Sequence, residues 1–378
     1  MAALWPPGQA LMIAAVFKLF GETAFPLKML YLAVSTWALM LTCVYHSLEK
    51  IKKPVLKFSL CFLPFFFSVF QTWVFDDSLV LSENVSLPLF IIGFCFFIFW
   101  LQDKKWGYLI ASAAIFAALA YFRGYFEVFG RFLALAMVIY LIILKIKSKK
   151  TILTPKVITM MSALLVFMML LMPWRIYNSK HFGTYSWQPG MTVMWPFYWV
   201  PDSKSSFHGE AAENTACHIQ PELCSYFYTR DLSLQPGGTL PSSFYRMLTL
   251  TALLEHPIAW YGVKAKAFNV FWFGEHNIPL SWNEILHRPI MLLGGVLIFL
   301  SGVFSLIYSA FLWFRKKLFL GQKELFVFSG SFIFFNFILF TFFHFEPRYS
   351  LYLQLLFIYL PLWLFFGFNE NSQRDENL

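Results

Sequence analysis

The sequence has little charge for its length. Charged residues make up 13% of its 378 residues and hydrophobic residues 59%, with a mean hydropathy of +0.62, whereas a soluble globular chain carries about 25% charge. The five cysteines are too few for a disulfide scaffold. A P-loop, a GxGxxG motif and a His/Cys cluster with metal-ligand spacing are absent from the sequence. The composition therefore predicts a polytopic membrane protein, for which we expect an all-α fold, and no motif predicts a nucleotide or metal site.

The first residues, MAALWPPGQALMIAAVFKLFG, lack the features of a signal peptide. They contain no basic region ahead of an apolar run and no small-residue cleavage site. The apolar run at 10–20 is about half of the ~20 residues that a bilayer crossing needs, and Lys18 interrupts it. We expect residues 1–25 to form a juxtamembrane segment.

Long apolar runs are plentiful in the rest of the chain. They predict about nine spans with ends uncertain by a few residues, at 26–45, 55–73, 85–101, 106–122, 126–145, 153–173, 290–313, 324–343 and 349–368. We therefore expect a transmembrane bundle over 26–173 and 290–368, interrupted by the long connection 174–289 and followed by a short tail, 369–378.

The basic residues gather in alternate connections. These connections hold Lys50, Lys52, Lys53 and Lys57; Lys104 and Lys105; Lys145, Lys147, Lys149, Lys150 and Lys156; and Arg315, Lys316, Lys317 and Lys323. The short connections between them, VFDDSLVLSE, FRGYFE and HFEPRY, contain acids and few cations. The positive-inside rule then places the lysine-rich loops and the C-terminal tail in the cytoplasm, and residues 1–25 and 174–289 outside. Orientation also explains the net charge of +9 without a nucleic-acid partner.

The long connection is expected to form a small extracytoplasmic subdomain. Cys217 and Cys224 lie in it, and an oxidising compartment favours a disulfide between them over free thiols. The stretch 255–276 is amphipathic with two lysines, which indicates a helix along the membrane interface. The other three cysteines, Cys43, Cys61 and Cys95, fall inside spans and are interpreted as small apolar residues.

Ionisable residues at external helix ends are the candidate site residues, because charges near hydrocarbon are costly and often functional. Glu83 opens the third span, where an N-terminal acid stabilised by the helix dipole is an equal explanation. Arg123 and Arg131 flank the outer end of the fifth span, and Glu127 is the expected partner of Arg131 at i−4.

Two further groups of candidates lie near the ends of other spans. Arg175 follows Trp174, for which interfacial anchoring is the alternative. FHFEPRYSLYLQ brings Glu346, Arg348 and Tyr349 to the mouth of the last span, where a structural salt bridge is the alternative. Arginines suit a phosphate held bidentately, and carboxylates suit general-base or hydroxyl-orienting work.

Several segments resemble the GT-C membrane glycosyltransferases, in particular the protein O-mannosyltransferase and aminoarabinose-transferase-like group (glycosyltransferase family 39-like). The similar features are the Trp5–Gly8 turn, Phe20-Gly21 before a span that opens with Lys28, Ser82-Glu83, Arg123, PWRIYNSKHFG and EPRYSLYLQLLFIYLPLW. They occur in the order found in that group and extend over essentially the whole chain.

This resemblance implies a GT-C-like helical bundle in the cytoplasmic (inner) membrane. The implied reaction transfers a sugar from a polyprenyl-phosphate donor to a lipid, glycan or protein acceptor on the outer face. Arg348 and Arg123 would stabilise the leaving phosphate, with Arg175, Glu346 and Tyr349 beside it. Glu83 would orient a sugar hydroxyl or support a divalent metal, and no cofactor is certain.

The family's main catalytic carboxylate has no counterpart in this sequence. In the family, a span and an external loop with a catalytic Asp precede the Pro-Pro turn, whereas no Asp or Glu occurs here before Glu22. We therefore expect a sequence that is short at its N-terminus and inactive as written. The alternatives are a non-catalytic or degenerate GT-C-like protein, and a lipid or glycan transporter or flippase. A transporter is expected to carry paired helix breaks or ionisable residues near mid-bilayer, of which the spans have few.

The charge asymmetry predicts that the connection 174–289 is extracytoplasmic. A phosphatase fused after residue 235 should be active in intact cells, and a cysteine introduced there should react with an impermeant thiol reagent. Labelling only after the cells are opened would reverse the predicted orientation.

Overall fold

The computed structural model describes residues 7–23, 25–67, 83–147, 155–182, 251, 253–273, 282–342 and 347–368. The described residues form helices and contain no strand, which confirms the all-α class. The chain divides into two compact units. The first unit comprises Met1–Pro189, Val296–Phe332 and Gln354–Leu378, and the second comprises Gly190–Gly295 and Ile333–Leu353.

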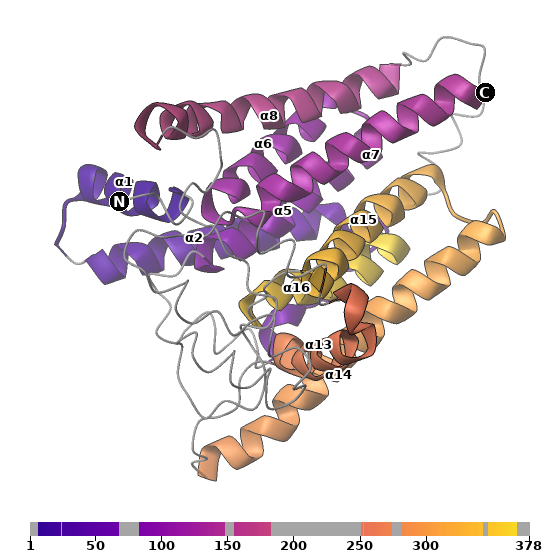
Figure 1. The fold of residues 1–378 in the computed structure, drawn as a ribbon. Coiled ribbons are helices and arrows are strands. Elements are labelled where there is room, and N and C mark those ends of the chain that lie inside the picture. The colour runs from indigo at the N-terminus through magenta and orange to yellow at the C-terminus, as the bar shows by residue number, and fades with distance from the viewer. Residues whose placement is uncertain are drawn as a thin grey trace. The chain divides into compact units, whose positions relative to one another are not determined.

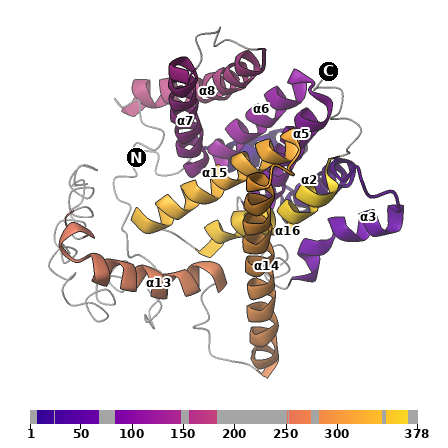
Figure 2. The same cartoon turned by 90° about the vertical axis from the view of Figure 1, so that its right-hand side faces the viewer.

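The N-terminal half of the first unit supplies most of its helices. They are α1 (Gly8–Phe20), α2 (Phe25–Ser47), α3 (Pro54–Cys61), the short 3-10 helix η1 (Leu63–Phe66), α5 (Glu83–Asp103), α6 (Trp106–Phe122), α7 (Tyr125–Lys147) and α8 (Pro155–Phe182). Helices α2, α5, α6 and α8 lie side by side in that order, and α7 packs against α6 and α8 (Figures 1 and 2).

Four helices complete the described fold. Helix α13 (Pro257–Phe273) belongs to the second unit. Helices α14 (Trp282–Phe314), α15 (Leu320–Phe342) and α16 (Pro347–Phe366) each contribute residues to both units.

Within the described part of the chain, five helical segments are long and apolar enough to cross a membrane, so the chain is a multi-pass membrane protein. They are Leu27–Ser47, Glu83–Asp103, Val157–His181, Leu292–Phe314 and Leu320–Thr341, and shorter apolar helices are Gly8–Phe20, Trp106–Phe122 and Ser350–Phe366. Two predicted spans differ in detail. Helix α8 continues through Pro173 to Phe182 instead of ending at residue 173. In the region 55–73, α3 ends at Cys61 and η1 follows, and residues 68–73 lie outside the described part.

Helix α5 forms the centre of the first unit. Side chains on all its faces are buried, since apolar residues surround the helix axis instead of forming one stripe. Phe90 and Phe94 contact the ring of Phe332 from α15 at centroid distances of 4.9 and 6.4 Å. Gly93 lets α6 approach closely, and the Ser112 hydroxyl donates to the Gly93 carbonyl at 2.8 Å. The same small residue thus permits close packing and supplies a polar contact.

The connections that hold Lys50, Lys104 and Lys323 meet at one end of the first unit, here called the lysine end. The Gln102 amide donates to the carbonyls of Ser47 and Gly367 at 2.9 and 2.6 Å, which joins the C-terminal ends of α2, α5 and α16. Lys104 lies 3.9 Å from Glu324 near the start of α15. These helices therefore share the direction that the alternating loop charges predict.

Helix α1 lies against the beginning of α2 and the end of α6. A Cβ atom on Gly8 would lie 2.5 Å from the Tyr121 carbonyl oxygen, so the absence of a side chain permits this contact. Gly21 ends α1 with a φ of 74°, a conformation that glycine adopts without strain. The Lys28 ammonium donates to the Gly21 carbonyl at 2.9 Å and also to that of Phe20. Lys28 therefore caps the C-terminus of α1.

Two helical glycines provide a matched test of the packing. A Cβ on Gly302 of α14 would overlap the Phe357 ring of α16, whereas nothing lies within 4 Å of a Cβ on Gly330 of α15. We expect Gly302→Ala to destabilise the protein by about 1–3 kcal/mol through overpacking. Gly330→Ala should be neutral or slightly stabilising, because alanine favours helix. Thermal unfolding in detergent measures both, and equal midpoints for the two variants would contradict the α14–α16 contact.

Candidate functional site

The helix ends opposite the lysine end bring charged residues together. Helices α5 and α7 begin there and α6 and α8 end there, because α5 to α8 run in alternating directions. This alternation gathers side chains that are far apart in the sequence at one end of the first unit. We call them the glutamate–arginine cluster, which consists of Glu83, Arg123, Glu127, Arg131 and Arg175.

Glu83 and Arg123 form a buried ion pair. Glu83 is the first residue of α5, where the helix dipole favours an acid, and Arg123 follows the last turn of α6. The side chains are only 2% and 7% exposed. Loss of one partner would leave an uncompensated buried charge, which costs about 3–5 kcal/mol. The pair thus ties the start of α5 to the end of α6.

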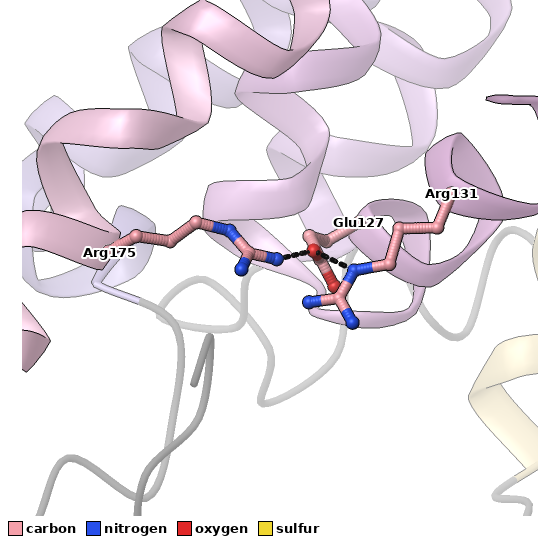
Figure 3. Close-up of polar contacts among 3 residues, drawn as sticks. All are labelled: Glu127, Arg131 and Arg175. Atoms are coloured by element: carbon pink, nitrogen blue, oxygen red, sulfur yellow. Dashed lines mark hydrogen bonds and ion pairs between the residues drawn. The ribbon is translucent and has the colours of Figure 1, made fainter. Parts of the chain in front are cut away.

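Glu127 accepts from two arginines through the same carboxylate oxygen. The Nε of Arg131 donates to Oε1 of Glu127 at 2.6 Å, which confirms the partner predicted from i,i+4 spacing. A terminal nitrogen of Arg175, from α8, donates to this same oxygen (Figure 3). Sequence spacing does not indicate the second contact, because 48 residues separate Arg175 from Glu127.

The cluster carries excess positive charge toward its exposed side. The five named residues of the cluster, all in the described part of the chain, supply three guanidinium groups and two carboxylates, a sum of one positive charge. The Arg131 side chain is 53% exposed, whereas that of Glu127 is 2% exposed and that of Arg175 is 11% exposed. The arrangement can therefore accept an anion beside Arg131, and planar guanidinium groups suit phosphate or carboxylate.

The structure unites only part of the predicted site. Three predicted site residues lie in the cluster: Glu83, Arg123 and Arg175. The cluster also contains Glu127 and Arg131, which the sequence analysis predicted only as partners of each other. Arg348 and Tyr349 lie in the first turn of α16. Glu346, Cys217 and Cys224 fall outside the described residues. Among the residues that the structure describes, no group of three His, Cys, Asp or Glu side chains could hold a metal ion.

Comparison of the chain with protein-family models, curated proteins and solved structures finds no match. The GT-C resemblance of the sequence therefore remains a prediction.

The second unit contains a buried lysine in an aromatic environment. Lys264 of α13 is 3% exposed, and its ammonium lies 5.7 Å from the Trp260 ring centroid and 5.4 Å from that of Phe340. Trp260, Lys264, Phe268 and Trp272 recur at i, i+4, i+8 and i+12 on one helix face. Lys264 thus lies on the buried face of α13, and the interfacial placement of 255–276 stays a prediction. Burial lowers the pKa of this amine to about 7.

The lowered pKa predicts a pH-dependent cost of burying Lys264. An unfolded lysine has a pKa near 10.4, so between pH 7 and 10 the unfolded chain binds more protons and stability increases with pH. Lys264→Met should raise the thermal midpoint by about 4 °C or more at pH 6 and by less at pH 10. The exposed Lys52, replaced by Met, is the control. A gain that is equal at both pH values would contradict the lowered pKa.

Proposed function

We propose that this protein is a GT-C-like membrane glycosyltransferase. It moves a sugar from a polyprenyl-phosphate donor to a lipid, glycan or protein acceptor on the outer face of the cytoplasmic membrane. The observation that carries the proposal is the glutamate–arginine cluster, with three guanidinium groups, one net positive charge and an exposed Arg131. A cationic site at the ends of apolar helices suits the phosphate of a lipid carrier, because lipid phosphates lie at this depth.

The cluster would act on the leaving group. An acceptor hydroxyl attacks the anomeric carbon, the bond from that carbon to the phosphate oxygen breaks, and a carboxylate accepts the hydroxyl proton. Negative charge then develops on the lipid phosphate, and fixed guanidinium groups stabilise it in a site of low dielectric constant. Arg123 and Arg175 of the cluster are proposed phosphate residues, and the family resemblance of the sequence adds Glu346, Arg348 and Tyr349 as further proposed residues. Glu83 is proposed to orient a sugar hydroxyl or to support a divalent metal.

The proposed function includes the orientation of the protein in the membrane. About nine spans, with the lysine end in the cytoplasm, place the glutamate–arginine cluster at the outer surface. The lysine end and the cluster lie at opposite ends of α5. This separation of positive loops from the cluster is what an outer-face lipid site would require.

A non-catalytic membrane protein on the same scaffold is the second candidate. Both carboxylates of the cluster are engaged by arginines, Glu83 by Arg123 and Glu127 by Arg131 and Arg175. Ion pairs that only lock helix ends together would have this geometry. Measurement of sugar transfer separates the two candidates.

Sugar transfer should fall at least about tenfold in Glu83→Gln and in Arg348→Ala, since loss of one charged transition-state contact costs about 1.4 kcal/mol or more. Because the sequence is expected to be inactive as written, the assay uses a version extended upstream by a span and an acidic loop, in membranes supplied with labelled polyprenyl-phosphate sugar and a mixed acceptor fraction. Lys105→Ala, an exposed change at the lysine end, is the matched control. Expression and thermal midpoint are recorded for each variant.

Two results would contradict the proposal. Transfer equal to wild type in both variants would remove Glu83 and Arg348 from the site. Absence of transfer by the extended version without substitutions, with polyprenyl phosphate still bound, would favour the non-catalytic candidate.

A further inference from the structure

Glu127 is the centre of the cluster's hydrogen bonding. Its Oε1 accepts from Arg131, one turn further along α7, and from Arg175 near the end of α8 (Figure 3). Both guanidinium groups therefore direct an N–H group at one carboxylate oxygen. An oxygen of a bound phosphate would seek these same donors, because guanidinium groups recognise carboxylate and phosphate with similar geometry.

The two arginines differ in how far they can turn away from Glu127. The Arg175 side chain is 11% exposed, whereas the Arg131 side chain is 53% exposed. A flexible aliphatic chain connects the Arg131 guanidinium group to α7. An anion that arrives from outside the first unit meets Arg131 first. Arg131 can then exchange the carboxylate for the anion without breaking the helix that carries it.

The Glu83–Arg123 pair differs from the contacts of Glu127 in its burial. It joins one carboxylate to one guanidinium, and both side chains are buried. Exchange there would uncover a buried charge, which is costly. The exposed, shared arrangement around Glu127 is therefore the part of the cluster suited to exchange.

We propose that Glu127 is a built-in counterion that competes with a lipid phosphate for Arg131 and Arg175. In the empty site the carboxylate holds both guanidinium groups. A phosphate monoester or diester displaces it from Arg131 and shares Arg175. This inference rests on the proposed function, because it concerns the regulation of the same phosphate site. It makes Glu127 a positioning residue that limits affinity.

The test measures binding by the purified full chain in detergent. The probes are a polyprenyl monophosphate, the matching uncharged polyprenol and inorganic phosphate. Glu127→Gln should lower the Kd for the polyprenyl monophosphate by about five- to tenfold, because the competing negative charge is gone. Asp103→Asn removes the same charge at the lysine end, where Asp103 pairs with Lys105 at 3.2 Å, and should leave the Kd unchanged. Binding of the polyprenol should not respond to either change.

The outcomes separate the inference from the proposed function. Weaker or unchanged lipid-phosphate binding by Glu127→Gln, with clear binding by wild type, overturns the counterion role and leaves the proposed function standing. Absence of polyprenyl monophosphate binding by wild type and by both variants overturns both. Equal affinity for inorganic phosphate and for the lipid would keep the counterion role and reject a lipid as the source of the phosphate.

A second variant covers failure of the first to fold. Glu127→Asp keeps the charge but shortens the side chain by one methylene, so it cannot hold Arg131 and Arg175 at the present distances together. We expect a smaller decrease in the Kd, in the same direction. An increase in the Kd would show that Glu127 preorganises the arginines for the anion, which contradicts the inference.

Discussion

Charges at the ends of apolar helices must be paired, and this constraint organises the first unit. An unpaired glutamate or arginine at the edge of hydrocarbon is costly, so each buried member of the glutamate–arginine cluster has an opposite charge against it. The pairs also join helices. Glu83 and Arg123 join α5 to α6, and Glu127 and Arg175 join α7 to α8. The ion pairs thus connect four helix ends that packing brings together.

Between the two ends of the first unit, packing depends on aromatic rings and small residues. Helix α5 is buried on all its faces, and phenylalanines of α5, α6, α7 and α15 contact one another around it. Gly93 and Ser112 let α6 approach α5. At the lysine end the Gln102 amide donates to carbonyl groups at the ends of two other helices. Carbonyl groups at a helix end have no donor within their own helix, so Gln102 supplies one. A polar group is therefore used where helices end, and apolar rings fill the space between.

Lys264 in the second unit is a buried charge that lies among aromatic rings. Its ammonium lies over the faces of Trp260 and Phe340, and ring faces attract a cation. The Trp260 indole donates to the Thr341 carbonyl at 3.1 Å, which holds α13 against the end of α15. The lowered pKa of Lys264 records the remaining cost of its burial. Ion pairs in the first unit and aromatic ring faces around Lys264 in the second both reduce the cost of burying a charged group.

The sequence by itself determined the class of the protein, the approximate extent of most apolar helices and the alternation of basic and acidic connections. Apolar runs and loop charges are local properties, so they can be read without knowledge of the fold. The i,i+4 contact of Glu127 and Arg131 was predictable for the same reason, since helix geometry alone sets it. The pairing of Glu83 with Arg123, and of Arg175 with Glu127, was decided only by the tertiary structure. These contacts depend on which helix ends meet, and side-chain packing along α5 to α8 sets that choice. Lys264 required the tertiary structure too, because the pattern of α13 shows a lysine among aromatic residues but not which face of the helix is covered.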